Sequence, residues 1–185
     1  GAGGLKADLS NSHEAAALFE KLDRDEPPLA GVIHNAMLFH RQEFMSTSPS
    51  VFEDVWRSMV LTAIYVSHQA IPRLKANGGG TLVFTGASGS RRAGAGFAAF
   101  SSAKFGLRGL AQSLAREHGD DGIHVVHTVI DGLIWTARTR ERFMGARETN
   151  SMNVDELAKA YLHLFEQSPS IWTQEQDFRP RSEAK

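Results

Sequence analysis

Short apolar segments alternate along the chain with longer segments that have the spacing of amphipathic helices. The apolar segments, rich in Val, Ile and Leu, are residues 5–9, 29–34, 81–85 and 123–129, and the helical segments are residues 12–24, 51–75, 99–118 and 154–166. This alternation is typical of β-α-β units, in which helices join strands that pair in parallel. We therefore expect an α/β fold built on a parallel sheet.

The amino-acid composition and net charge indicate which kinds of partner the protein does not bind. Hydrophobic residues make up 42% and charged residues 22% of the 185 residues, as in ordinary globular proteins. Lys and Arg number 20 against 21 for Asp and Glu, a net charge of −1. Because nucleic acids and anionic membranes bind proteins through an excess of positive charge, we expect neither as a partner.

Several further features are missing from the sequence. It has no cysteine, which excludes disulfides, thiol nucleophiles and Cys-ligated zinc. Its eight histidines lack the spacing of a metal motif, so we expect no metal. No basic leader with an apolar core and no run of 18 apolar residues is present, so we expect a cytoplasmic protein. No repeat or linker divides the chain, and we expect residues 1–185 to form one domain.

Polar and glycine residues follow three of the expected strands. These segments are His34-Asn35-Ala36, Thr85-Gly86-Ala87-Ser88-Gly89-Ser90 and Asp131-Gly132 with Thr136. The carboxyl ends of parallel strands meet at one edge of a sheet, where ligands of open α/β folds bind. The sequence therefore predicts a binding site that these junctions share.

The same segments, taken in order, resemble the short-chain dehydrogenase/reductase family over essentially the whole chain. Asn35-Ala36 stands where the family has N-N-A-G, and residues 81–90 resemble its serine-bearing strand. Phe100-Ser101-Ser102-Ala103-Lys104 falls on the family's Y-x-x-x-K, and Asp131-Gly132 with Thr136 resembles P-G-x-x-x-T. The resemblance implies a doubly wound Rossmann-type sheet with helices on both faces.

The resemblance also implies a cofactor, either NAD or NADP. The cofactor-binding residues that it implies are Asp8, Asn35, Ala36, Lys104, Asp131, Gly132 and Thr136. A complete family member begins with a strand, a T-G-x-x-x-G-x-G turn, a helix and a second strand, and this chain starts just before the third strand. We therefore expect a partial domain that lacks the first β-α-β unit, either because it is a fragment or because an N-terminal region precedes residue 1.

The family's catalytic Asn, Ser, Tyr and Lys are only partly present. Lys104 matches the lysine, whereas the tyrosine that exchanges a proton with the substrate is replaced by Phe100. The serine position falls on Ala87, with Ser88 beside it, and the asparagine position falls near Val60. The resemblance implies that Lys104 holds the ribose of the cofactor, while Phe100, Ala87 and Ser88 line the substrate pocket.

Three hypotheses follow. The first is an NAD(P)-dependent oxidoreductase with an altered active site that acts on a small carbonyl or alcohol. The second is a non-catalytic nucleotide-binding or scaffold member of the family, and the third is a truncated chain with no cofactor site. In each case we expect a homodimer or homotetramer formed through helices 51–75 and 99–118, which resemble the family's subunit interface.

Overall fold

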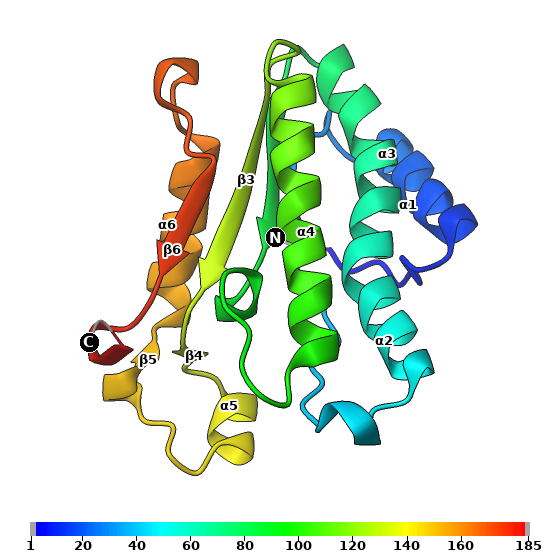
Figure 1. Ribbon diagram of the computed structural model, residues 1–185. Helices are drawn as coiled ribbons and strands as arrows, with labels where there is room; N and C mark the ends of the chain where they lie inside the picture. The colour runs from blue at the N-terminus through cyan, green and yellow to red at the C-terminus, as the bar shows by residue number, and fades with distance from the viewer. Residues whose placement is uncertain (1–2, 184–185) are drawn as a thin grey trace.

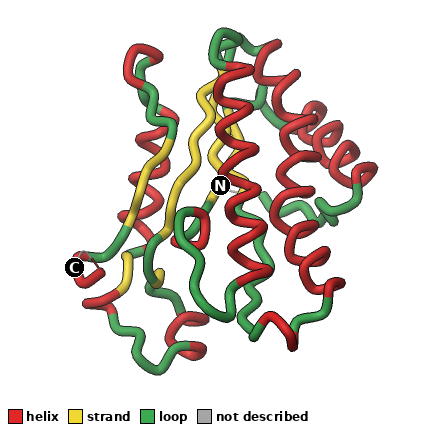
Figure 2. Tube along the Cα trace, viewed as in Figure 1, coloured by secondary structure: helices red, strands yellow, loops and turns green. Residues whose placement is uncertain are grey.

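The computed structural model describes residues 3–183 and contains a four-stranded parallel sheet (Figures 1 and 2). The strand order is β1-β2-β3-β6, with bounds Gly31–His34, Gly80–Thr85, Ile123–Ile130 and Glu175–Phe178. A second, two-stranded parallel sheet pairs β4 (Leu133–Ile134) with β5 (Ser151–Met152). The α/β fold expected from the alternating pattern is confirmed.

Helices cover both faces of the main sheet. They are α1 (Ser12–Asp25), α2 (Pro49–Trp56), α3 (Thr62–Ala76), α4 (Ala98–His118), α5 (Ala137–Arg142) and α6 (Val154–Phe165). In Figure 1, α3 and α4 lie in front of the sheet and α6 lies behind it, while α1 packs beside α3. None of the helices in residues 3–183 is both long and apolar enough to cross a membrane.

Alternation along the strands divides the core between the two faces. Leu82, Phe84 and Val125 point toward α3 and α4, where they join the larger hydrophobic cluster. Val83 and Val126 point the other way and pack against α6. Each central strand is therefore buried on both sides, which explains why apolar residues occur on both of its faces.

The helix expected at residues 51–75 is a continuous helical run from residue 49 to residue 76. A π-helical turn at Arg57–Leu61 separates α2 from α3 and contains Val60. Such widened turns are rare and are often found near functional sites. This turn lies beside the carboxyl end of β1, because Thr62 bonds to His34 there.

The strand predicted at residues 5–9 was wrong. The residues between Gly3 and Asp8 have no regular secondary structure, and no strand of the sheet lies beside them within the described part of the chain. Local polar bonds determine the backbone there instead, because the Asp8 amide donates to Glu14 and the Asp8 carboxylate accepts from Ser10.

Candidate active site

Lys104 is a buried charged residue at the carboxyl edge of the sheet. It lies on α4 with only 1% of its surface exposed, and its Nζ donates a 2.7 Å hydrogen bond to the carbonyl of Thr85, the last residue of β2. Burial lowers the pKa of Lys104 to about 8. Within residues 3–183 the Thr85 carbonyl is the only hydrogen-bond acceptor of this ammonium group, so two of its three N–H donors can serve a ligand.

Phe100 lies one helical turn before Lys104, on the same face of α4. Its ring centroid is 5.8 Å from Lys104 Nζ, and the side chain is 6% exposed. Phe39 and Phe97 pack against it, with centroid separations of 5.3 and 6.5 Å. The position next to the lysine therefore provides an apolar wall and has no proton to donate.

Residues Ala87 and Ser88 begin the turn that follows β2. Ala87 is half-buried against the main core and donates its amide to Ser90 Oγ at 3.1 Å. The Ser88 side chain is also half-buried, and its backbone carbonyl accepts from the amides of Arg91 and Arg92. Of the two residues only Ser88 carries a hydroxyl that could meet a substrate.

A buried polar chain that the sequence analysis did not identify supports this turn. Ser90 Oγ lies 3.2 Å from His127 Nε2, and His127 Nδ1 lies 3.1 Å from a Glu175 carboxylate oxygen. Arg108 donates two bonds to the same carboxylate, at 2.6 and 2.9 Å. Gly86 lies against this chain, because a Cβ there would be 2.6 Å from His127 Cε1 and 2.7 Å from Ser90 Oγ.

Electrostatics determines the direction of the hydrogen bonds in this chain. Burial opposes ionisation of Glu175, but bonds from Arg108 and His127 outweigh it and lower the pKa of the carboxyl. Since an ionised carboxylate only accepts, His127 donates from Nδ1 and accepts from the Ser90 hydroxyl at Nε2. Burial lowers the pKa of His127, which keeps the ring neutral and suited to this arrangement.

His34 is a second buried histidine near Lys104. Its Nε2 lies 2.8 Å from Thr62 Oγ1, whose own proton goes to the Ser58 carbonyl, so the ring donates to Thr62. Burial and, second, the charge of Lys104 lower the pKa of His34 to about 4. Nδ1 of this neutral ring is buried and has no hydrogen-bond partner among the described residues.

The residues predicted for the adenosine side of a cofactor come together in part. Asp8 and Ala36 line one surface pocket of about 330 Å³, which Asp54 and Arg57 border from the helix opposite. Hydrogen bonds from the side chain and then the amide of Ser10 lower the pKa of Asp8. Asn35 is exposed directly after β1.

The residues predicted for the nicotinamide side have other bonds in the structure. Asp131 is 6% exposed and accepts two 3.0 Å bonds from Arg92. Gly132 has a φ of 148°, which favours glycine. Thr136 caps the start of α5 by accepting from the Thr139 amide at 3.1 Å. Their contact with a cofactor remains a prediction.

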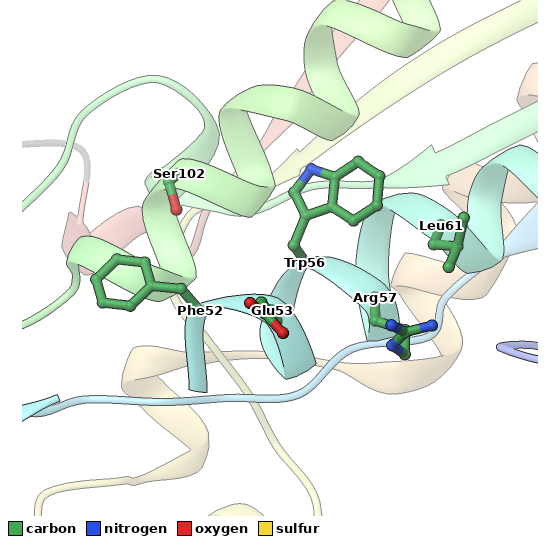
Figure 3. A pocket seen from close by; sticks show the side chains of 6 residues that line it. All are labelled: Phe52, Glu53, Trp56, Arg57, Leu61 and Ser102. Atoms are coloured by element: carbon green, nitrogen blue, oxygen red, sulfur yellow. The ribbon is translucent and has the colours of Figure 1, made fainter. Parts of the chain in front are cut away.

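A further pocket, of about 370 Å³, lies away from Lys104 between α2 and α4. Figure 3 shows Trp56 between Phe52 and Leu61, with Ser102 of α4 opposite Phe52. Trp56 is 43% exposed. The pocket lies on the two helices that the sequence analysis assigned to a subunit interface.

A parallel sheet with helices on both faces defines a doubly wound α/β protein, a class whose ligands bind at the carboxyl edge of the sheet. The sequence matches the model of the short chain dehydrogenase family over residues 2–146, and the chain belongs to this family. A solved short-chain dehydrogenase from Rhodopseudomonas palustris is 34% identical, with a TM-score of 0.77, and the match covers 94% of this chain and 72% of that one.

Curated relatives are named only as uncharacterized oxidoreductases. YciK of Escherichia coli (strain K12) is 32% identical over 108 residues, which are 58% of this chain and 43% of the relative. A Schizosaccharomyces pombe relative is 33% identical over 142 residues, 75% of this chain and 54% of the relative. The chain therefore spans about half the length of these proteins.

Proteins of lower identity share the fold. A candidate NAD(P)-dependent gluconate 5-dehydrogenase from Beutenbergia cavernae, solved with NADP at low occupancy, has a TM-score of 0.81 at 20% identity. The match covers 94% of this chain and 73% of that one. At this identity the likeness shows the Rossmann-type fold alone.

Proposed function

We propose that the chain forms part of an NAD(P)-dependent oxidoreductase that acts on a small carbonyl or alcohol. The observation that carries this proposal is Lys104, a buried ammonium group at the carboxyl edge of the sheet whose one acceptor among the described residues is the Thr85 carbonyl. Burying a charge that lacks an ionic partner lowers stability. A role in ligand binding gives a physical reason to retain it, since ribose hydroxyls can accept its free N–H donors.

The surrounding residues fit such a cofactor. Lys104 would hold the ribose, and the pocket beside Asp8 and Ala36 would receive the adenosine side. Gly132 and Thr136 would border the nicotinamide side. The nicotinamide, when bound, supplies or accepts a hydride, and the protein's part is to orient it and the substrate.

The proton that accompanies the hydride needs another source than Phe100. Ser88 carries one candidate hydroxyl in the turn after β2, and a water molecule held by Lys104 is the other candidate. Loss of a general acid or base typically lowers rates by about 10²–10⁴-fold. We therefore expect slow turnover, which Phe100→Tyr combined with Ala87→Ser should increase.

Titration with NADH and NADPH, followed by nucleotide fluorescence, tests the proposal. We expect saturable binding of at least one nucleotide that weakens by about tenfold or more in Lys104→Ala, since each lost bond to a charged group contributes about 1.5–3 kcal/mol. Lys75→Ala removes an exposed lysine and is the matched control. Equal affinity in Lys104→Ala and the control would contradict the proposal.

The second candidate is a non-catalytic nucleotide-binding or scaffold protein. The observation that favours it is the packing of Phe100 between Phe39 and Phe97, which fills the proton donor's position with apolar groups. Tight nucleotide binding with no turnover, in both the natural chain and the Phe100→Tyr, Ala87→Ser variant, would favour this candidate over the oxidoreductase.

We further propose that the protein is a homodimer or homotetramer formed through α2, α3 and α4. Support comes from exposed aromatic side chains on these helices, Trp56 at 43% and Phe105 at 44%. Partly exposed aromatic residues on adjoining helices are common at protein interfaces. Sedimentation equilibrium should give a mass of two or four chains, and a monomer at micromolar concentration would contradict this.

A further inference from the structure

Three aromatic rings gather above Lys104 at the carboxyl edge of the sheet. This aromatic cluster consists of Phe39, Phe97 and Phe100, whose ring centroids are 5.3 to 6.5 Å apart. Phe100 lies against Lys104, while Phe39 and Phe97 are half-buried and come from the segments that follow β1 and β2. The cluster therefore extends from the buried ammonium group toward the surface.

Two arginines lie on the outer side of this cluster. The guanidinium carbon of Arg142 is 4.7 Å from the centroid of Phe39, and that of Arg41 is 5.2 Å from the centroid of Phe97. Arg142 ends α5, so it comes from a segment far along the chain from Arg41. The two cations therefore lie over two adjacent rings, since the centroids of Phe39 and Phe97 are 6.0 Å apart.

Neither arginine uses its hydrogen-bond donors. Across residues 3–183, the side chains of Arg41 and Arg142 form no ion pair and donate no hydrogen bond, although those of six other arginines do. A guanidinium group that stacks on a ring keeps its N–H groups free in its own plane. Both side chains are exposed, so a ligand can reach these donors.

Four pairs of a cation and an aromatic ring meet at this edge. They are Lys104 with Phe100, Arg41 with Phe97, and Arg142 with both Phe39 and Phe143. Such pairs are attractive, by about 0.5–1 kcal/mol at exposed sites. A set of charges over adjacent rings suits a ligand that is both apolar and anionic.

Exposed apolar side chains stand next to Phe39 and Arg142 in the sequence. They are exposed at 52% for Met37, 43% for Leu38, 37% for Phe143 and 97% for Met144. They come from the segment after β1 and the segment after α5, which Arg142 and Phe39 bring into contact. Methionine surfaces adapt to ligands of different shape, so they would accept an apolar body of variable outline.

We propose that the substrate has an apolar body and a terminal oxyanion, and that Arg142 and Arg41 bind that oxyanion. The inference rests on the proposed function, which places the reacting carbon near Lys104. The apolar body would lie along Phe39 and Phe97, and the oxyanion would accept from the in-plane N–H donors. A guanidinium fork matches carboxylates and phosphates alike, so the chemistry is that of an apolar acid or phosphate ester.

Calorimetric titration with three probes tests this inference. The probes are 4-phenylbutyrate, phenyl phosphate and the uncharged 4-phenylbutan-1-ol, each added with and without NADPH at low ionic strength. We expect at least one anion to bind about tenfold or more tightly than the alcohol, the scale of a hydrogen bond to a charged group. The preference should weaken with added salt, since the guanidinium groups are exposed. The anion that binds more tightly distinguishes a carboxylate from a phosphate substrate.

Variants locate the anion site. Arg142→Gln and Arg41→Gln should each lower the affinity for the preferred anion by about fivefold or more and leave the affinity for the alcohol unchanged. Arg138→Gln is the matched control, because Arg138 lies on the same helix, is exposed and contacts no ring. Arg142→Lys keeps the charge but loses the planar fork, so it should recover only part of the affinity.

Several results would overturn the inference. They are equal binding of the anions and the alcohol, no binding of any probe with or without NADPH, and equal losses in Arg142→Gln and Arg138→Gln. Failure of the proposed function gives a different result. In that case neither NADH nor NADPH binds, while the anion preference and its dependence on Arg142 remain.

Discussion

Replacement of Lys104 by methionine should change how stability depends on pH. Lys104 is 1% exposed, and burial lowers its pKa from 10.5 to about 8. The unfolded chain therefore binds more protons than the folded chain between pH 8 and 10.5, and this residue makes stability rise with pH in that window. Below pH 8 the penalty for burying the charge is present in full.

The magnitude follows from the shift in pKa. Each pKa unit corresponds to about 1.4 kcal/mol, so the full penalty is about 3 kcal/mol, of which about 2 kcal/mol should be relieved between pH 7 and 9.5. Methionine has a similar length and no charge, and it removes the penalty at every pH. It also leaves the Thr85 carbonyl without its 2.7 Å donor, which costs about 1–3 kcal/mol at every pH.

Urea denaturation of both proteins at pH 7 and 9.5 measures the effect. Groups common to both proteins cancel in the difference, so the natural chain should gain about 2 kcal/mol relative to Lys104→Met over this range. Lys6→Met, at an exposed lysine, is the control for loss of a charge. A difference between the natural chain and Lys104→Met that stays constant with pH would refute the argument that Lys104 is buried as a charged group.

Three other substitutions test the surroundings of the site by urea denaturation. Gly86→Ala places a methyl group against the ring of His127 and should lower the free energy of unfolding by about 1–3 kcal/mol; an unchanged value would contradict the close packing. His34 is buried, with a pKa of about 4, so the unfolded chain takes up its proton before the folded chain as the pH falls. The natural chain should therefore lose about 2 kcal/mol of stability relative to His34→Gln between pH 7 and 4.5. The same dependence of stability on pH in both proteins would argue against this. Tyr161→Phe removes the buried hydroxyl that lies 2.6 Å from Thr128 Oγ1 and should cost about 1 kcal/mol, whereas a neutral effect would show that the bond contributes nothing.

The hydrophobic pattern of the sequence predicted most strands of the main sheet. The strands at residues 29–34, 81–85 and 123–129 were confirmed within two residues, because each is short, rich in Val, Ile or Leu and preceded by a turn signal. Residues 5–9 also contain apolar side chains, but no strand lies beside them in the described chain, and they do not form a strand. Apolar side chains in a segment do not by themselves provide a neighbouring strand with which it can pair.

The last strand could not be predicted for the opposite reason. β6 has the sequence Glu-Gln-Asp-Phe, in which polar residues dominate, and all four side chains are only half-buried. Pairing with β3 and ion pairs determine its structure, since Glu175 lies opposite His127 and bonds to Arg108, while Asp177 bonds to Arg91. These partners are distant in sequence, so no local pattern indicates them.

One part of the candidate site could be predicted from local sequence, and another part could not. The spacing of Phe100 and Lys104 was enough to place both on one face of α4, since four residues make about one turn. The chain from Ser90 through His127 to Glu175 joins three elements separated by 37 and 48 residues. A polar residue in each of three separate segments gives no signal of its own, and only the strand register brings them into contact.

The role of Lys104 is tested most directly by an NMR titration of its ammonium group in protein labelled with ¹³C and ¹⁵N at lysine. Comparison with Lys104→Met assigns its resonance. We expect this resonance to titrate with a pKa of about 8 and to shift when NADH or NADPH is added. A resonance that neither nucleotide moves would contradict the central claim that Lys104 is buried at the edge of the sheet in order to bind a nicotinamide cofactor.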